Sequence, residues 1–138
     1  MATTNSEKKS KRLKIQSGSK WEYIVGYSRL IKAGSTIEVA GTTATNEQGA
    51  IIGKNNPYQQ TKYILQKIET YLEKAGASME DVVRTRMFVT DIGQWEEIGK
   101  AHAAFFKEIK PVATMVEVSK LINPDLLIEI EVTAILSE

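Results

Sequence analysis

Two strand-like stretches of this 138-residue chain alternate charged and apolar side chains. In I-E-I-E-V-T near the C-terminus, Glu129 and Glu131 share one face of the predicted strand. In V-V-R-T-R-M-F-V, Arg84, Arg86 and Phe88 share one face in the same way. A period of two is typical of strands that bury their apolar face. Because carboxylates transfer protons and guanidinium groups bind anions, the charged face is the first place to look for chemistry.

The charged face is predicted to extend across a whole sheet. We expect it to carry Glu38, Arg84, Arg86, Phe88, Ala113, Met115, Glu117, Glu129 and Glu131. We expect the opposite face to pack on helices through Ile37, Val39, Val83, Met87, Val89, Val116, Val118, Ile128, Ile130 and Val132. The charged face is either solvated or covered by neighbouring subunits, with its charges paired across the contact or lining a site. The bulky apolar side chains among the charges favour the covered interpretation.

The elements that would position this face follow from apolar spacing and from Gly, Pro and Asn. Ala33-Gly34-Ser35 predicts a turn between two strands. One helix is predicted from Asn56-Pro57 to about Gly76, and a second over residues 94–107. Residues 111–136 predict a closing hairpin of two strands joined by an Asn-Pro-Asp turn. The order β-β-α-β-α-β-β indicates an α+β fold with both helices on one face of a single sheet.

The composition restricts the class of protein. A hydrophobic fraction of 42% and a charged fraction of 25% are ordinary for a globular domain. The net charge of +1 creates no field that would attract nucleic acid or an anionic membrane. No apolar run approaches the roughly 20 residues that span a membrane. Without cysteine there are no disulfides or thiolate ligands, and the carboxylates lack nearby histidines, so we expect neither a metal nor a cofactor.

Residues 1–20 are polar and locally basic, and we expect them to form a flexible arm. Residues 21–138 are then expected to form one domain. The N-terminus lacks the hydrophobic core of a secretory signal, which favours a cytoplasmic location. His102, the sole histidine, falls on the apolar stripe of the second helix, where a packed and hydrogen-bonded role is favoured over catalysis.

Several motifs together carry a family resemblance. They are Y-S-R-L-I-K-A-G-S-T-I-E-V-A-G-T, V-V-R-T-R-M-F-V-T-D-I, A-H-A-A-F-F, V-E-V-S-K-L and I-E-I-E-V-T-A-I. In sequence and order they resemble the Rid/YjgF family, also called reactive-intermediate deaminases or L-PSP endoribonuclease-like proteins, over residues 26–136. The resemblance implies a chorismate-mutase-like protomer and a homotrimer with three ligand clefts between subunits.

The resemblance also assigns roles to individual positions. In the family, an arginine near the start of the penultimate strand binds the carboxylate of a 2-imino acid. Ala113 stands at that position here, and Met115 replaces a frequent cysteine. The family pattern assigns the orientation of the attacking water to Glu131, and it places Tyr27 and Gly41 on the cleft wall.

The expected site therefore has Glu131 as its catalytic residue. The expected ligand-binding positions are Tyr27, Gly41, Thr42, Arg86, Phe88, Ala113, Thr114 and Met115. Arg86 either replaces the missing cation or pairs with a glutamate at a subunit contact.

The expected function is to bind a small metabolite between subunits and to hydrolyse an imine or a related C–N bond. Without the arginine, a 2-imino acid loses a charge-assisted contact worth on the order of 2–5 kcal/mol, which places the chain in an arginine-less branch. A non-catalytic binding or interaction module is the alternative. Endoribonuclease activity, a third possibility, has only the family's naming in its favour.

Overall fold

The structure is a computed structural model that describes residues 12–137. Its strands form one sheet in the order β1-β2-β3-β6-β4-β5. They are β1 (Leu13–Ile15), β2 (Leu30–Ala33), β3 (Thr36–Thr42), β4 (Val82–Val89), β5 (Val112–Glu117) and β6 (Ile128–Ile135). All neighbours are antiparallel except β4 and β5, which are parallel.

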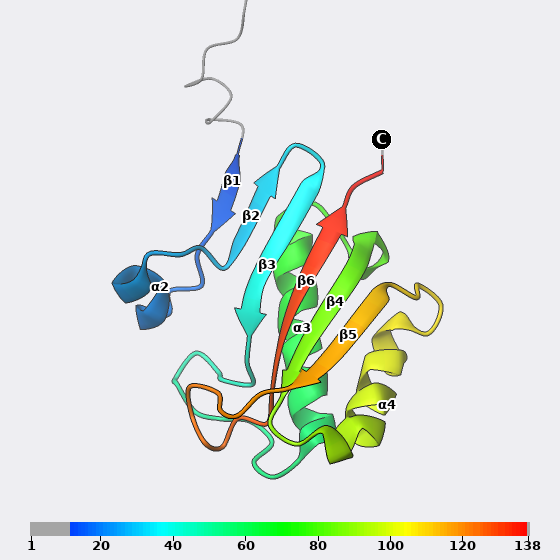
Figure 1. The fold of residues 1–138 in the computed structure, drawn as a ribbon. Coiled ribbons are helices and arrows are strands. Elements are labelled where there is room, and N and C mark those ends of the chain that lie inside the picture. The colour runs from blue at the N-terminus through cyan, green and yellow to red at the C-terminus, as the bar shows by residue number, and fades with distance from the viewer. Residues whose placement is uncertain (1–11, 138) are drawn as a thin grey trace, which may run out of the picture.

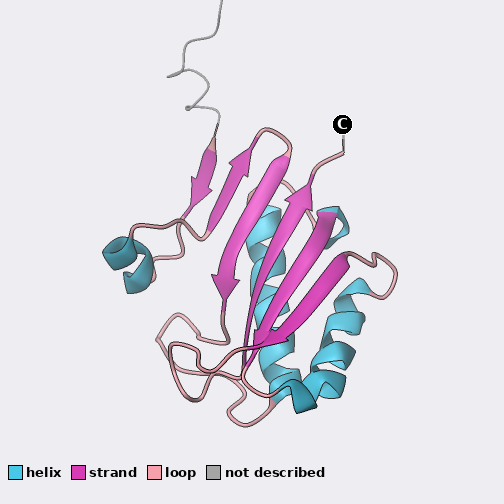
Figure 2. Ribbon diagram, viewed as in Figure 1, coloured by secondary structure: helices cyan, strands magenta, loops and turns pink. Residues whose placement is uncertain are grey.

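Two long helices, α3 (Pro57–Lys74) and α4 (Trp95–Phe106), cover one face of this sheet. Figures 1 and 2 show both helices on the same side, with the other face of the sheet left open. The predicted α+β fold is therefore confirmed. No helix within residues 12–137 is long and apolar enough to cross a membrane.

The boundaries of α3 follow from local sequence. The side chain of Asn56 accepts a hydrogen bond from the backbone N–H of Gln59 at 2.9 Å, and Pro57 occupies the first turn. Gly76, with φ of +80°, takes the left-handed conformation that ends many helices. The turn at Gly34 and Ser35 also forms as predicted, because Ala33 pairs with Thr36 across it.

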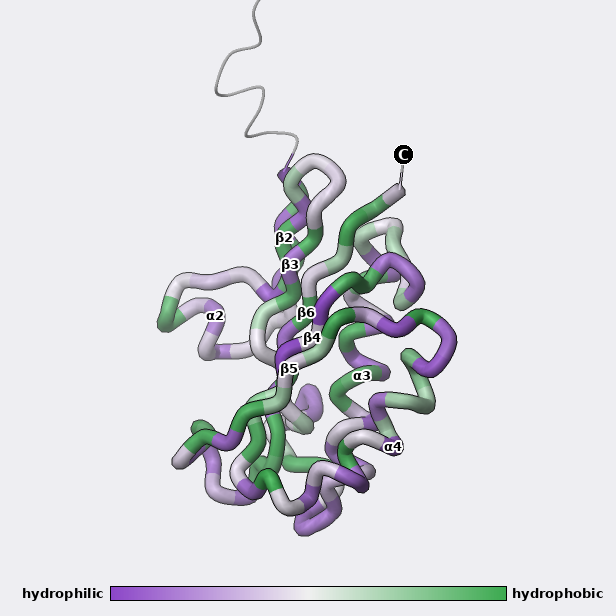
Figure 3. The backbone as a smooth tube through the Cα atoms, turned by 45° about the vertical axis from the view of Figure 1, so that its right-hand side comes forward, coloured by the Kyte–Doolittle hydropathy of each residue, from purple (hydrophilic) through white to green (hydrophobic). Residues whose placement is uncertain are grey.

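The core lies between the helices and the sheet. Figure 3 shows hydrophilic and hydrophobic residues alternating along the strands. The fully buried side chains that fill the core include Leu30, Ile37, Ile64, Leu65, Ile68, Leu72, Val89, Ile98, Ile128 and Ile130. Periodicity of two in the strands and of three to four in the helices thus brings both apolar faces together.

The predicted closing hairpin is wrong. The Asn-Pro-Asp turn does form, with the backbone N–H of Asp125 donating to Oδ1 of Asn123 at 2.8 Å. However, β4 lies between β5 and β6. Helix α4 carries the chain from β4 back to a parallel β5, the usual arrangement for a strand–helix–strand unit. The last strand then enters between β3 and β4 instead of pairing with its predecessor.

The predicted face of β5 is wrong for the same reason. In the parallel register Ala113 lies beside Thr85 and Met115 beside Met87, and both of these β4 residues are buried. Met115 accordingly packs against the core. Glu117 accepts a hydrogen bond from a backbone N–H of the connection before α4. These β5 side chains therefore belong to the helix-covered side and not to the charged face.

Thr114 and Val116 instead lie on the open face, beside Arg86 and Phe88 of β4. Val116 is 42% exposed, although we predicted it to face the helices. Val83 is also exposed, because a register irregularity at the start of β4 interrupts the alternation there. Alternation alone predicts that two faces exist, but the neighbouring strand decides which face is buried.

The sheet extends further toward the N-terminus than the sequence indicated. Strand β1 pairs with β2, and a short helix, α2 (Lys20–Val25), follows it. Figure 1 shows α2 beyond the edge of the sheet, away from α3 and α4. The greater part of the predicted flexible arm, residues 1–11, lies outside the described residues.

Candidate functional site

The centre of the candidate site is a close contact between Gly41 on β3 and Glu129 on β6. A Cβ atom on Gly41 would lie 2.1 Å from Oε2 of Glu129. Atoms of separate groups do not approach so closely, so any larger residue at Gly41 would displace the carboxyl group. The glycine therefore creates the space that the carboxyl group occupies.

A β-bulge places Gly41 in this position. Ala40 and Gly41 together lie opposite Glu131, because the register between β3 and β6 shifts between Val39 and Thr42. As a result, Val39 and Thr42 are both buried although they are three residues apart. Bulges commonly redirect side chains next to functional sites.

Glu129 is half-buried, and this burial raises the pKa of its carboxyl group above the ordinary value. The positive charge of Arg29 opposes that rise, whereas the negative charge of Glu131 adds to it. A carboxyl group whose pKa moves toward neutrality can both accept and donate a proton. Glu129 is therefore the candidate acid–base group of the described chain.

Arg29, immediately before β2, binds the backbone of this site directly. Its Nη1 atom donates to the carbonyl oxygen of Gly41 at 2.6 Å and to Oγ1 of Thr42 at 3.3 Å. Its Nη2 atom donates to the hydroxyl of Tyr27 at 3.3 Å. The residue is only 7% exposed. A planar guanidinium group can make all these contacts at once, which lysine cannot do.

Helix α2 supplies the counter-charge for Arg29. Oε2 of Glu22 lies 3.4 Å from Nε of Arg29, and Glu22 is buried as well. Ser17 fixes this carboxylate further, because its backbone N–H donates to Oε1 at 2.8 Å and its hydroxyl donates to Oε2. A buried guanidinium group needs such a partner, since an unpaired charge inside a protein is costly.

Lys67 of α3 holds the chain that leaves β3. Its Nζ atom donates to the carbonyl oxygens of Thr43 at 3.0 Å and Thr45 at 2.8 Å. Burial and the nearby charge of Arg29 lower the pKa of Lys67 to about 8, while Glu22 has the opposite effect.

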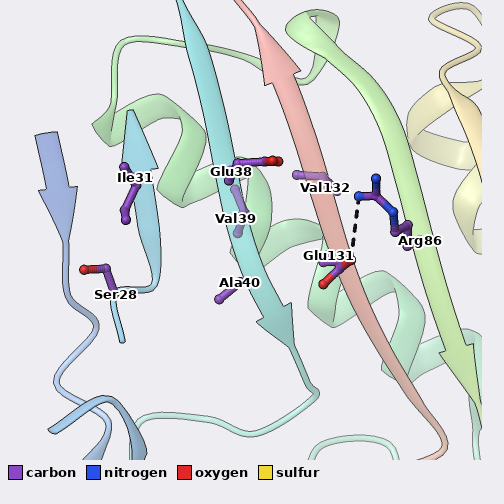
Figure 4. A pocket seen from close by; sticks show the side chains of 8 residues that line it. All are labelled: Ser28, Ile31, Glu38, Val39, Ala40, Arg86, Glu131 and Val132. Carbon is purple, nitrogen blue, oxygen red and sulfur yellow. Dashed lines mark ion pairs between the residues drawn. The ribbon is translucent and has the colours of Figure 1, made fainter. Parts of the chain in front are cut away.

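A shallow groove on the open sheet face contains a second ion pair. Nη1 of Arg86 lies 3.6 Å from Oε1 of Glu131, and Figure 4 shows the pair together with Glu38, which also leans over β6. Ser28 and Ile31 line the side of the groove nearest β2. Arg86 and Glu131 thus share one face and pair within a single protomer.

The structure divides the predicted site residues into three groups. Those that contact Arg29 are Tyr27, Gly41 and Thr42. Those on the open face are Glu131, Arg86, Phe88 and Thr114. Those on the helix-covered side of β5 are Ala113 and Met115. Ala113 and Met115 therefore lie on the opposite face of the sheet from Glu131, Arg86, Phe88 and Thr114 within one protomer.

Sequence reasoning missed Glu22 and Arg29, and it chose Glu131 rather than Glu129 as the catalytic residue. The two glutamates of I-E-I-E look equivalent in the sequence, and only pairing with the bulged β3 separates them. For Arg29 a signal was available. A charged residue directly before the apolar L-I of β2 must either be solvated or have a buried partner.

His102 has the packed, hydrogen-bonded role that the sequence favoured. Its Nε2 atom and Oγ1 of Thr85 are 2.9 Å apart, and its ring lies 4.7 Å from that of Phe106. Burial lowers the pKa of His102. Because it lies between α4 and β4, the sheet separates it from Glu129. Within residues 12–137, no group of three His, Cys, Asp or Glu side chains is arranged to hold a metal ion.

Comparison with known proteins identifies the family. The family model described as Endoribonuclease L-PSP matches residues 18–136. The chain belongs to this family. The expected Rid/YjgF membership is thereby confirmed, and the matched region contains Glu22, Arg29, Gly41 and Glu129.

Solved and curated relatives agree with this assignment to the YjgF/L-PSP family. Rv2704 from Mycobacterium tuberculosis, a member of the YjgF/YER057c/UK114 family, is 46% identical, with a TM-score of 0.82 over 91% of this chain and 99% of that one. A RutC family protein of Pyrococcus abyssi is 37% identical over 108 residues, covering 78% of this chain and 84% of its own length. E. coli TdcF, solved with bound serine, is 26% identical, with a TM-score of 0.74 over 80% of this chain and 88% of that one.

Proposed function

We propose that this YjgF/L-PSP protein binds a small metabolite in clefts between the subunits of a homotrimer. There it hydrolyses an imine or a related C–N bond, with Glu129 as the acid–base group. The contact between Gly41 and Glu129 carries the proposal, because it holds a half-buried carboxyl group in a space that only glycine leaves open.

Hydrolysis of an imine requires proton transfers in both directions. As the oxygen of water adds to the imine carbon, a base removes a proton from water and the nitrogen gains a proton. The hydroxyl-bearing intermediate then loses its hydroxyl proton while the C–N bond breaks and ammonia leaves with the proton it needs. One carboxyl group with a pKa raised toward neutrality can serve both steps.

The role moves from Glu131, which the sequence suggested, to Glu129. Glu131 is already paired with Arg86 at 3.6 Å, and 37% of its side chain is exposed. The Arg86 guanidinium group therefore already occupies one oxygen of this carboxylate. Glu129 is instead half-buried, with its carboxyl group in the space beside Gly41, and no ion pair occupies it among the described residues, which suits a group that exchanges protons with a ligand.

The open face of the sheet supports assembly into a trimer. Ile31, Val116 and Ile135 are each more than a third exposed on this side. Glu129 lines neither the groove beside Arg86 nor the one beside α2 in the described part of the single chain. A second copy that covers the open face would bury the apolar side chains and complete a cleft over Glu129.

Light scattering tests the assembly. We expect the wild-type mass to be three times that of one chain, and Val116→Asp to shift the mass toward the monomer while circular dichroism stays unchanged. A wild-type monomer would exclude a cleft between subunits. Lys62→Asp, on the exposed side of α3, is the matched control and should leave the trimer intact.

The ligand is proposed to be a small polar metabolite. The bound serine of TdcF supports a ligand of this size. Ala113 offers no guanidinium group, and Arg86 is paired within the protomer. A 2-imino acid would therefore lack the carboxylate contact that the family resemblance implies, so imines without a carboxylate deserve equal weight in any assay.

The decisive experiment measures ammonia release from imines generated in situ, using an amino-acid oxidase for carboxylate-bearing imines and an amine oxidase for neutral ones. We expect the wild-type protein to accelerate release and Glu129→Gln to reduce that acceleration by about 100-fold or more. Glu131→Gln, the matched control, should retain most of it. Because the sheet separates Ala113 from Glu129 within one protomer, Ala113→Arg should improve release from carboxylate-bearing imines only where β5 of a neighbouring subunit completes the cleft.

If the wild-type protein does not differ from buffer with either class of imine, the proposal is wrong. Thermal stabilisation by a metabolite that is recovered unchanged would then favour the non-catalytic binding module. Cleavage of RNA has weaker support, because acid–base cleavage usually recruits a pair of titrating groups and His102 lies across the sheet from Glu129.

A further inference from the structure

Arg29 connects the N-terminal segment to the backbone of the candidate site. On one side its Nε atom lies 3.4 Å from Oε2 of Glu22 in α2. On the other side its Nη1 atom donates to the carbonyl oxygen of Gly41 at 2.6 Å. Both charged residues are almost fully buried. Little water can therefore replace these contacts, and the position of the ion pair restrains the residues that Arg29 binds.

Gly41 is the point at which this pair meets the candidate acid–base group. Its carbonyl oxygen is held by Arg29, and its Cα faces the carboxyl group of Glu129. A displacement of the Gly41 peptide would therefore change the space available to the Glu129 side chain. Thr42 and Tyr27 accept hydrogen bonds from the same guanidinium group, so Arg29 contacts the residue after Gly41 as well as Gly41 itself.

Helix α2 is attached to the rest of the site chiefly through Glu22. Its exposed residues include Trp21, Tyr23, Ile24 and Val25, so the helix makes little apolar contact within the protomer. Backbone hydrogen bonds from Gly26 and Tyr27 to the Glu22 carbonyl oxygen close the helix directly after this residue. The short segment therefore has one buried charged group, and that group points at Arg29.

We infer that Arg29, held by Glu22, is a positioning residue that fixes Gly41 and, through it, the carboxyl group of Glu129, so that α2 completes the site. The inference rests on the proposed function only in taking Glu129 as the acting group. Burying both charges costs free energy of desolvation, which attachment of a six-residue helix alone does not explain. Positioning of Gly41 gives the buried pair a role.

The charges around Glu129 predict pKa shifts of opposite sign when Arg29 or Glu22 is replaced. Arg29 faces it across Gly41, Glu131 lies on its own strand, and Arg86 of β4 lies on the same sheet face but is paired with Glu131. Removing the positive charge of Arg29 must raise the pKa of Glu129. Removing the negative charge of Glu22 leaves that positive charge unbalanced, so the pKa of Glu129 must fall.

The test is an NMR titration of the full-length protein labelled with ¹³C at glutamate carboxyl carbons, with the Glu129 signal assigned from its loss in Glu129→Gln. We expect Arg29→Gln to raise the pKa of Glu129 and Glu22→Gln to lower it. Arg29→Lys keeps the positive charge but loses the planar guanidinium group. The pKa of Glu129 should then stay near the wild-type value, while the hydrogen bonds to Tyr27 and Gly41 weaken. Lys54→Gln breaks the exposed Lys54–Asp125 pair and should change nothing.

Shifts of opposite sign cannot come from a general loosening of the fold, which would move both variants in one direction. Equal signs, or no shift in either variant, would overturn the inference. If Arg29→Gln does not fold, the direction of the shift in Glu22→Gln alone decides, because glutamine matches glutamate in size and its amide oxygen still accepts a hydrogen bond from the backbone N–H of Ser17.

The same variants separate this inference from the proposed function. If wild-type protein releases no ammonia but the pKa of Glu129 responds with opposite signs, the positioning role stands and the imine chemistry fails. If ammonia is released and the pKa does not respond, the proposed function stands and the positioning role fails.

Discussion

Arg29 and Lys67, from different elements, bind successive parts of one short segment. Arg29 donates to the carbonyl oxygen of Gly41, and Lys67 donates to those of Thr43 and Thr45. The chain that leaves β3 is therefore held by two cations, one at the bulge and one in the following loop. Their mutual repulsion contributes to the lowered pKa of Lys67.

Lys67 should make stability depend on pH in the alkaline range. Folding lowers its pKa from 10.5 to about 8, so between these values the unfolded chain holds a proton that the folded chain has released. Stability must then rise with pH across this window. We expect the free energy of unfolding of the wild type, measured relative to Lys67→Met, to increase by on the order of 1 kcal/mol.

Denaturant unfolding at a series of pH values measures this difference. Lys62→Met, an exposed lysine on the same helix, is the control and should track the wild type at every pH. A wild-type difference from Lys67→Met that stays constant or declines across the window would contradict the prediction.

Gly41→Ala should reduce activity with little loss of stability. The new Cβ would meet Oε2 of Glu129 at 2.1 Å, and the flexible end of that side chain must move away. We expect ammonia release to fall at least about tenfold, because the acid–base group leaves its position. The backbone at Gly41 does not need a positive φ, so the fold itself tolerates alanine.

Gly99→Ala is the matched control, because a Cβ on Gly99 in α4 meets nothing within 4 Å. It should leave activity unchanged and stabilise the helix by about 0.5–1 kcal/mol. Full activity in Gly41→Ala would mean that the carboxyl group does not act from its observed place.

The acid limb of the pH–rate profile should report on Glu129. If its carboxylate acts as the base, the rate rises as the group loses its proton. Glu131 raises the pKa of Glu129, so Glu131→Gln removes a like charge and should shift this limb toward lower pH. Ammonia release measured against pH tests the direction, and a limb that stays in place or shifts upward would argue for another base.

Gln60 should be a sensitive position for stability. It is fully buried in α3, donates to the carbonyl oxygens of Gly53 at 3.2 Å and Asp125 at 2.9 Å, and accepts from the N–H of Leu127 at 2.9 Å. Gln60→Leu leaves these backbone groups without hydrogen-bond partners and should lower the free energy of unfolding by about 2–4 kcal/mol. Gln66→Leu, exposed on the same helix, should cost far less in the same denaturant experiment.

Much of the fold could be predicted from local sequence. Asn56 and Pro57 determine where α3 begins, and Gly34 permits the turn between β2 and β3. These features depend on residues a few positions apart, so they are visible without knowing what packs where. Glu129 and Glu131 share one face for the same reason, because strand alternation is local.

Strand order could not be predicted in this way. The alternation in β5 shows two faces, but whether Met115 or Val116 is buried depends on β4 lying beside it in parallel register. A hairpin with β6 would have given another answer. Long-range pairing is chosen by the packing of the whole sheet, which no short window contains.

By itself, the sequence determined the α+β layers, the family and the charged strand face. Only the tertiary structure decided which glutamate lies against Gly41 and that Glu22 reaches Arg29. Alternation and capping act within one element, whereas a bulge in β3 and a buried ion pair from α2 exist only once distant segments are packed together.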